Sequence, residues 1–80
     1  MLQLHRACYM WRVSAGLTQS QIYGSEKVKA VSAFENGRST NINHFERYLE
    51  IAIEMDQKSE FDYYVNYQIE LQLKRNKKEG

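Results

Sequence analysis

Apolar residues recur every three or four positions along most of the first 56 residues of the chain. Leu4, Cys8, Trp11 and Ala15 are separated by four, three and four residues, and Gly16 follows them. Such spacing places the four side chains on one face of an α-helix, and a glycine directly after this face is a common helix end. We therefore predict a first helix that ends at Gly16.

Two further short helices are predicted in the segment that follows. Thr18 can cap the first, TQSQIY, and Ser25 can cap the second, EKVKAVSAFEN. Each of these segments is followed by a glycine. Ser and Thr before a helix and Gly after it satisfy or accommodate the free backbone groups at the two ends. The two helices would be joined by a tight turn.

A fourth helix is predicted after the polar loop RSTN. Apolar side chains there have neighbours three or four residues away: Ile42, Phe45, Tyr48, Leu49, Ala52 and Met55. This spacing is typical of an amphipathic helix. The last residues of the segment also alternate between apolar and polar or small side chains, so the last turn could instead be extended.

The segment from residue 61 to residue 73 has a different period. Its odd positions are all apolar or aromatic, namely Phe61, Tyr63, Val65, Tyr67, Ile69, Leu71 and Leu73. Its even positions are polar except Tyr64. A two-residue period is typical of a strand with one buried face, whereas a helix would split these side chains between two sides. We therefore favour a strand over a helix, with QKSE before it as a hairpin loop.

These elements predict a mainly α fold of four short helices with a C-terminal β-strand, possibly a hairpin, that serves dimerisation. Residues 1–56 would form the helical core, and residues 57–80 the strand and a basic tail of the same domain. Eighty residues form only a small core, so a second copy would add stability. No apolar run is long enough for a membrane span or a signal peptide, and a cytoplasmic location is expected.

The net charge of +1 is unevenly distributed. Residues 1–47 hold six Lys or Arg against three acids, residues 48–70 hold one lysine against six acids, and residues 71–80 have a balance of +3. The first part of the chain could face phosphates, and the middle could not.

Catalytic and metal-binding patterns are missing from the sequence. His5 and His44 lie far apart, and neither has a cysteine or carboxylate at the spacing of metal ligands. No nucleophile, base and orienting group form a recognisable set. We expect no enzymatic activity, no metal and no cofactor.

The segment RVSAGLTQSQIYGSEKVKAVSAFENGRS resembles the helix-turn-helix DNA-binding domains of the phage repressor, Cro and xenobiotic-response type. The matching pieces are Arg12 with Gly16, then LTQ, Ile22 and VSAFENG, and the fourth helix extends the likeness to about residue 52. The spacing between the two helices of the motif is two residues shorter than usual, which is close to the length in Rgg-type regulators. Tyr23 stands where the family places a small alanine.

The resemblance implies three sets of DNA-contacting residues and one structural pair. Gln19 would contact a DNA phosphate. The groove-facing positions of the recognition helix would be Lys27, Val28, Lys29, Ala30 and Ala33. The loop that holds the DNA backbone would contain Asn36, Arg38, Ser39 and Thr40. Arg12 and Glu35 match a pair that forms a structural salt bridge in the family.

A long strand with no mate inside the chain needs a partner, and some Cro proteins and HipB-type antitoxins pair C-terminal strands across a dimer. The odd positions of residues 61–73 would then form the dimer interface. We therefore expect a dimeric regulator from a phage or bacterium that binds double-stranded DNA at a palindromic operator. The alternative is a protein-binding adaptor with the same fold, such as an antitoxin or an antirepressor.

Overall fold

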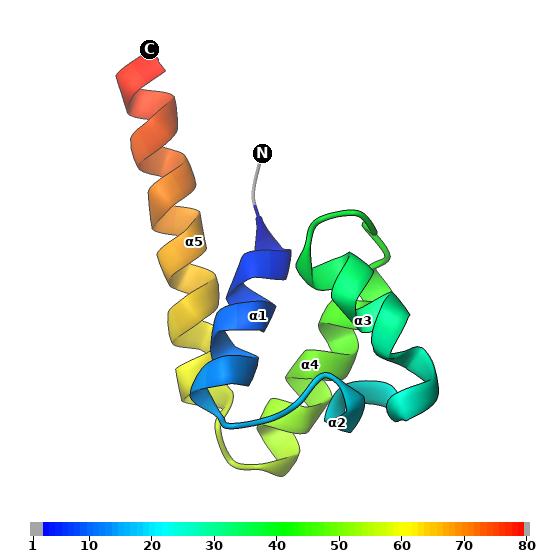
Figure 1. The fold of residues 1–80 in the computed structure, drawn as a ribbon. Helices are drawn as coiled ribbons and strands as arrows, with labels where there is room; N and C mark the ends of the chain where they lie inside the picture. The colour runs from blue at the N-terminus through cyan, green and yellow to red at the C-terminus, as the bar shows by residue number, and fades with distance from the viewer. Residues whose placement is uncertain (1–2, 80) are drawn as a thin grey trace.

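A computed structural model describes the backbone of residues 3–79 and the side chains of residues 3–75 (Figure 1). The elements in chain order are α1 (Leu4–Ser14), α2 (Ser20–Tyr23), the 3-10 turn η1 (Ser25–Lys27), α3 (Val28–Glu35), α4 (Ile42–Glu54) and α5 (Lys58–Glu79). The prediction of a mainly α fold is confirmed. No strand occurs among residues 3–79.

The predicted C-terminal strand is wrong, because the whole segment from Phe61 to Leu73 lies within α5. There is no hairpin loop either, since α5 already begins at Lys58. Burial follows a helical period: Phe61 is 1% exposed and the even-numbered Gln68 is 6% exposed, while Tyr63 is 64% exposed. Odd positions therefore point to different sides of α5, and the seven residues do not form one face.

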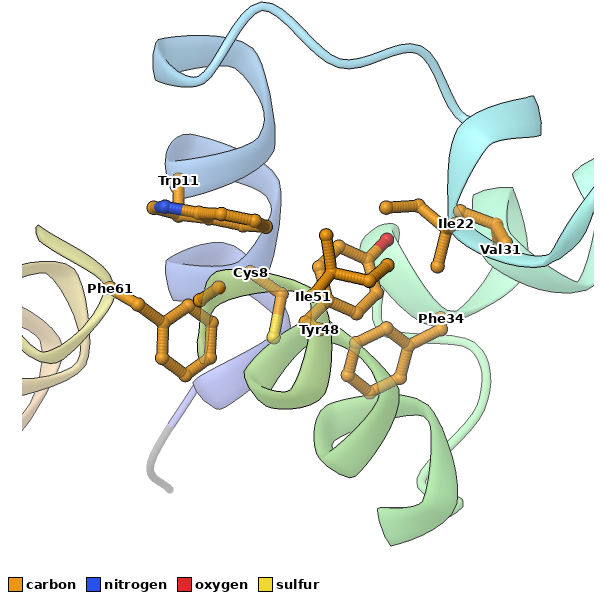
Figure 2. Packing of buried hydrophobic residues seen from close by; sticks show 9 residues of the cluster. Cys8, Trp11, Ile22, Val31, Phe34, Tyr48, Ile51 and Phe61 are labelled. Atoms are coloured by element: carbon orange, nitrogen blue, oxygen red, sulfur yellow. The ribbon is translucent and has the colours of Figure 1, made fainter. Parts of the chain in front are cut away.

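The core lies between α1, α3, α4 and the first turns of α5 (Figure 2). Its buried members are Cys8, Trp11, Ile22, Val31, Phe34, Tyr48, Ile51, Ala52 and Phe61. The ring of Phe61 meets the ring of Trp11 edge to face, with 5.6 Å between the centroids. Because α5 contributes a fully buried aromatic side chain, it is part of the core and packs chiefly along α1.

Three helices end in the same way, with a residue of positive φ. These residues are Gly16 (φ 76°), Gly37 (φ 77°) and Asp56 (φ 57°). In each case the next residue donates its N–H to the carbonyl five positions earlier, at N···O distances of 3.1, 2.8 and 2.7 Å respectively. This hydrogen bond is characteristic of the Schellman motif. The last turn of α4 is therefore helical, and the extended alternative does not occur.

The predicted N-caps are replaced by other arrangements. Thr18 does not cap α2 with its hydroxyl; instead Gln21 Oε1 accepts the Thr18 backbone N–H at 2.7 Å. Ser25 opens η1 and makes no side-chain cap. Asn41 caps α4, because its Oδ1 accepts the N–H of Asn43 at 2.9 Å. Helix α2, Ser20–Tyr23, is only one turn long. This agrees with the motif in the sequence, whose spacing is two residues shorter than usual.

Two alanine substitutions on α5 test its helical periodicity. Phe61→Ala should lower the free energy of unfolding by about 3–5 kcal/mol, because it leaves a cavity against Trp11. Tyr63→Ala should change it by less than about 0.5 kcal/mol, since Tyr63 is exposed. Urea denaturation in dilute solution measures both. Similar losses for the two variants would contradict the helix, because a strand would place both side chains on one buried face.

Candidate nucleic-acid interface

A buried ion pair joins α1 to the end of α3. Arg12 Nε donates to Glu35 Oε2 at 2.7 Å, and Arg12 Nη2 donates to Glu35 Oε1 at 3.0 Å. The two side chains are 11% and 3% exposed. Parallel hydrogen bonds of this kind are the strongest arrangement of a guanidinium and a carboxylate. Arg12 and Glu35 are the two residues for which the resemblance implies a salt bridge.

Further hydrogen bonds extend this pair across the molecule. The hydroxyl of Tyr48, on α4, donates to Glu35 Oε2. Gln19 Nε2, immediately before α2, donates to Glu35 Oε1 at 3.2 Å, and Arg12 Nη1 donates to the carbonyl of Leu17 at 2.8 Å. One carboxylate thus connects four helices. The Gln19 amide nitrogen, expected at a DNA phosphate, is directed inward to Glu35 in this structure.

The hydrogen bonds decide the charge state of Glu35. Burial by itself raises the pKa of Glu35, but donation from Arg12, Tyr48 and Gln19, together with the positive charge of Arg12, outweighs burial. The pKa of Glu35 therefore lies below its ordinary value of 4.5. Burial, followed by the neighbouring carboxylate, raises the pKa of Tyr48, so its hydroxyl remains a donor. Glu35 and Arg12 are both charged at neutral pH.

The outward side of α3, together with Lys27 at the end of η1, is positively charged, while Glu26 of η1 is exposed beside it. Lys27 and Lys29 are exposed, while the other groove-facing candidates, Val28, Ala30 and Ala33, are half-buried. From residue 27 to residue 45 the only carboxylate in the sequence is Glu35, and it is turned inward to Arg12. We call the exposed side of residues 27–40 the basic face. It has no exposed acid of its own.

The loop between α3 and α4 continues the basic face. Asn36, Arg38 and Thr40 are exposed and Ser39 is half-buried. Asn36 Nδ2 donates to the Ser32 carbonyl at 2.8 Å and so closes the end of α3. Ser39 Oγ accepts the Asn41 N–H at 3.4 Å. The structure thus brings the loop candidates beside the helix candidates, with Arg38 as the cationic side chain among them.

Tyr23 ends α2 at the position where the resemblance expects alanine, and it packs against α4. Its hydroxyl donates to the Asn43 carbonyl at 3.2 Å. Lys27 Nζ and Arg47 Cζ lie 5.8 and 5.9 Å from the centroid of its ring, within the range of cation–π contacts. Arg47 Nε also donates to the Ile22 carbonyl at 2.8 Å. The sequence did not predict this cluster, although a tyrosine at a position where the family has alanine was a signal that the packing here differs.

Among residues 3–75, no group of three or more His, Cys, Asp or Glu side chains could hold a metal ion. None of the helices described is long and apolar enough to cross a membrane.

Comparisons with protein-family models, curated proteins and solved structures found no match to this chain. A function can therefore be inferred only from the residues of this chain, namely the motif in the sequence, the basic face and the network around Glu35.

The charge of Glu35 can be tested by pH. Because its folded-state pKa is depressed, its contribution to stability is fully present above the ordinary pKa of 4.5 and is lost as pH falls through the lower folded value. Glu35→Gln should be less stable than wild type at neutral pH by about 1–3 kcal/mol, because it loses charge-assisted hydrogen bonds. The difference should shrink as pH falls from about 5 to about 2.

Urea denaturation of both proteins across this pH range gives the difference directly. The two proteins differ only at residue 35, so the subtraction isolates the contribution of Glu35. A difference that stays constant with pH would show that Glu35 is not the charged centre of the network.

Proposed function

We propose that this protein is a sequence-specific DNA-binding transcriptional regulator that acts as a homodimer by occupying a palindromic operator. The observation that carries the proposal is the basic face: residues 27–40 expose three cations and no acid. This face lies on a short helix that follows a tight turn, as in proteins that insert a helix into the major groove. The motif resemblance in the sequence points to the same residues.

Within this proposal the residues of the basic face have distinct roles. Lys27 and Lys29 would donate to phosphates or to guanine, and Arg38 would contact the DNA backbone from the loop. The methyl groups of Val28, Ala30 and Ala33 would contact thymine methyls. None of these side chains is a bidentate base reader, so specificity would depend on DNA shape and on a second half-site.

Exposed acids support one orientation of the protein on DNA. Glu46, Glu50 and Glu54 follow each other at intervals of four residues along α4, and all three are exposed. Their repulsion of phosphates would keep this side of α4 away from the duplex. The net charge of only +1 is compatible with DNA binding, because residues 27–40 expose cations and no acid.

A protein-binding adaptor, such as an antitoxin or antirepressor, is the second candidate. It is favoured by Ile53 and Met55, which are exposed at the end of α4. Exposed large apolar side chains are candidates for contacts with another protein.

Salt-dependent DNA binding is the test. Lys29→Gln should weaken binding in gel shifts on random and genomic DNA and should reduce the slope of log K against log salt by about one unit. Lys58→Gln is the matched control, since Lys58 is an exposed lysine on α5 that pairs only with Asp62 at the surface. It should leave the slope unchanged.

Equal changes of the salt slope in Lys29→Gln and Lys58→Gln would show that the basic face does not contact DNA. Should the folded wild-type protein fail to bind any DNA at low salt, the regulator proposal would be wrong and the adaptor would be the better candidate.

A further inference from the structure

Helix α4 holds the side chain of Tyr23 in place. The Tyr23 hydroxyl donates to the Asn43 carbonyl at 3.2 Å, and the ring meets the ring of His44 edge to face, with 5.5 Å between the centroids. Arg47 Cζ lies 5.9 Å from the Tyr23 centroid, and Arg47 Nε is itself fixed by the Ile22 carbonyl at 2.8 Å. The half-buried ring is therefore a fixed aromatic surface at the end of α2.

The ammonium group of Lys27 lies over this ring. Its Nζ is 5.8 Å from the Tyr23 centroid, within the range of a cation–π contact. Lys27 is the last residue of η1, directly before α3, and its side chain is exposed. The contact therefore connects the first cation of the basic face to a ring that α4 holds in place.

Carboxylates also lie near Lys27. Glu26 is exposed directly before it. Burial raises the pKa of Tyr23, and the nearby carboxylates of Glu50 and Glu46 on α4 add to this rise. Among residues 3–75, however, Lys27 forms an ion pair with none of these acids. This matters because an ion pair would offset the positive charge of Lys27, whereas an aromatic ring attracts the ammonium without carrying a net charge.

We propose that Tyr23 is a positioning residue for DNA binding, whose ring holds the Lys27 ammonium at the start of the basic face with its charge free to meet a phosphate. This inference rests on the proposed function. An ammonium group has three N–H donors, so the side turned away from the ring can still donate to DNA. The alanine that the resemblance expects at residue 23 has no ring and could not hold Lys27 in this way.

The ring would strengthen DNA binding through the freedom that Lys27 has already lost. A lysine side chain that is ordered before association loses less conformational entropy when DNA binds. The strength of a cation–π contact at an exposed site corresponds to roughly two- to fivefold in affinity. This contribution requires both the ring and the ammonium, so it is a coupling between two residues.

A double-mutant cycle in DNA binding tests this coupling. Tyr23→Leu, which removes the ring and keeps an apolar side chain, should raise the dissociation constant for a random-sequence DNA duplex by roughly two- to fivefold at low salt. In the Lys27→Gln background Tyr23→Leu should have no further effect, because no ammonium remains to be positioned. Fluorescence anisotropy of a labelled duplex gives the four dissociation constants.

Lys29→Gln is the matched control, because Lys29 is an exposed lysine of the same basic face. Tyr23→Leu should weaken binding by the same factor with and without Lys29→Gln. Tyr23→Phe, which keeps the ring, should bind DNA nearly as well as wild type. Additive effects of Tyr23→Leu and Lys27→Gln, or equal coupling of Tyr23 to both lysines, would mean that Tyr23 only supports the fold and would overturn the inference.

Proton NMR of the wild-type protein tests the position of Lys27 without DNA. The ring current of Tyr23 should move the Lys27 ε-methylene protons upfield of those of Lys29, and this shift should disappear in Tyr23→Leu. Equal shifts of the two lysines in wild type would overturn the inference, whether or not Tyr23→Leu folds. A wild type that binds no DNA would refute the proposed function and this role together, whereas additive effects in a protein that binds DNA would refute this role alone.

Discussion

The carboxylate of Glu35 is buried with its charge, and the positions of four helices follow from the need to satisfy it. An unpaired ionised group inside a protein costs several kcal/mol, so the donors around it cannot move apart freely. Arg12 supplies two of them from α1, Tyr48 supplies one from α4, and Gln19 supplies one from the start of α2. The end of α3 is thereby held at a defined place against the other helices.

The same interaction shapes the charge of the surface. Because Glu35 is the only acid between residues 27 and 45, its pairing with Arg12 removes the one negative charge that could have lain on the basic face. Lys27, Lys29 and Arg38 therefore face no exposed carboxylate within residues 27–40, although Glu26 is exposed directly before Lys27. A structural ion pair and a candidate DNA-binding surface are thus two consequences of one buried side chain.

Helix α5 shows why a local pattern can mislead. Of the odd positions, Phe61 and Val65 pack on the core, while Tyr63, Tyr67, Ile69 and Leu73 are exposed and spread around the rest of the helix. In the sequence they nevertheless alternate with polar residues, as in a strand. A polar residue, Gln68, is buried because it lies level with Met10 on α1. The order of apolar residues along the segment therefore does not record whether they lie on one face of a strand or are distributed around a helix.

The sequence alone determined the features that depend on near neighbours. The glycines after α1 and α3 mark the ends of these helices, because glycine adopts a positive φ without steric cost. The three- and four-residue spacings of apolar side chains identify α1 and α4. The motif also singled out Arg12 and Glu35. Only the tertiary structure decided that residues 61–73 are helical, that Gln19 turns inward, and that Tyr48 completes the network. Each of these depends on a partner distant in sequence, and no local period records which partner that is.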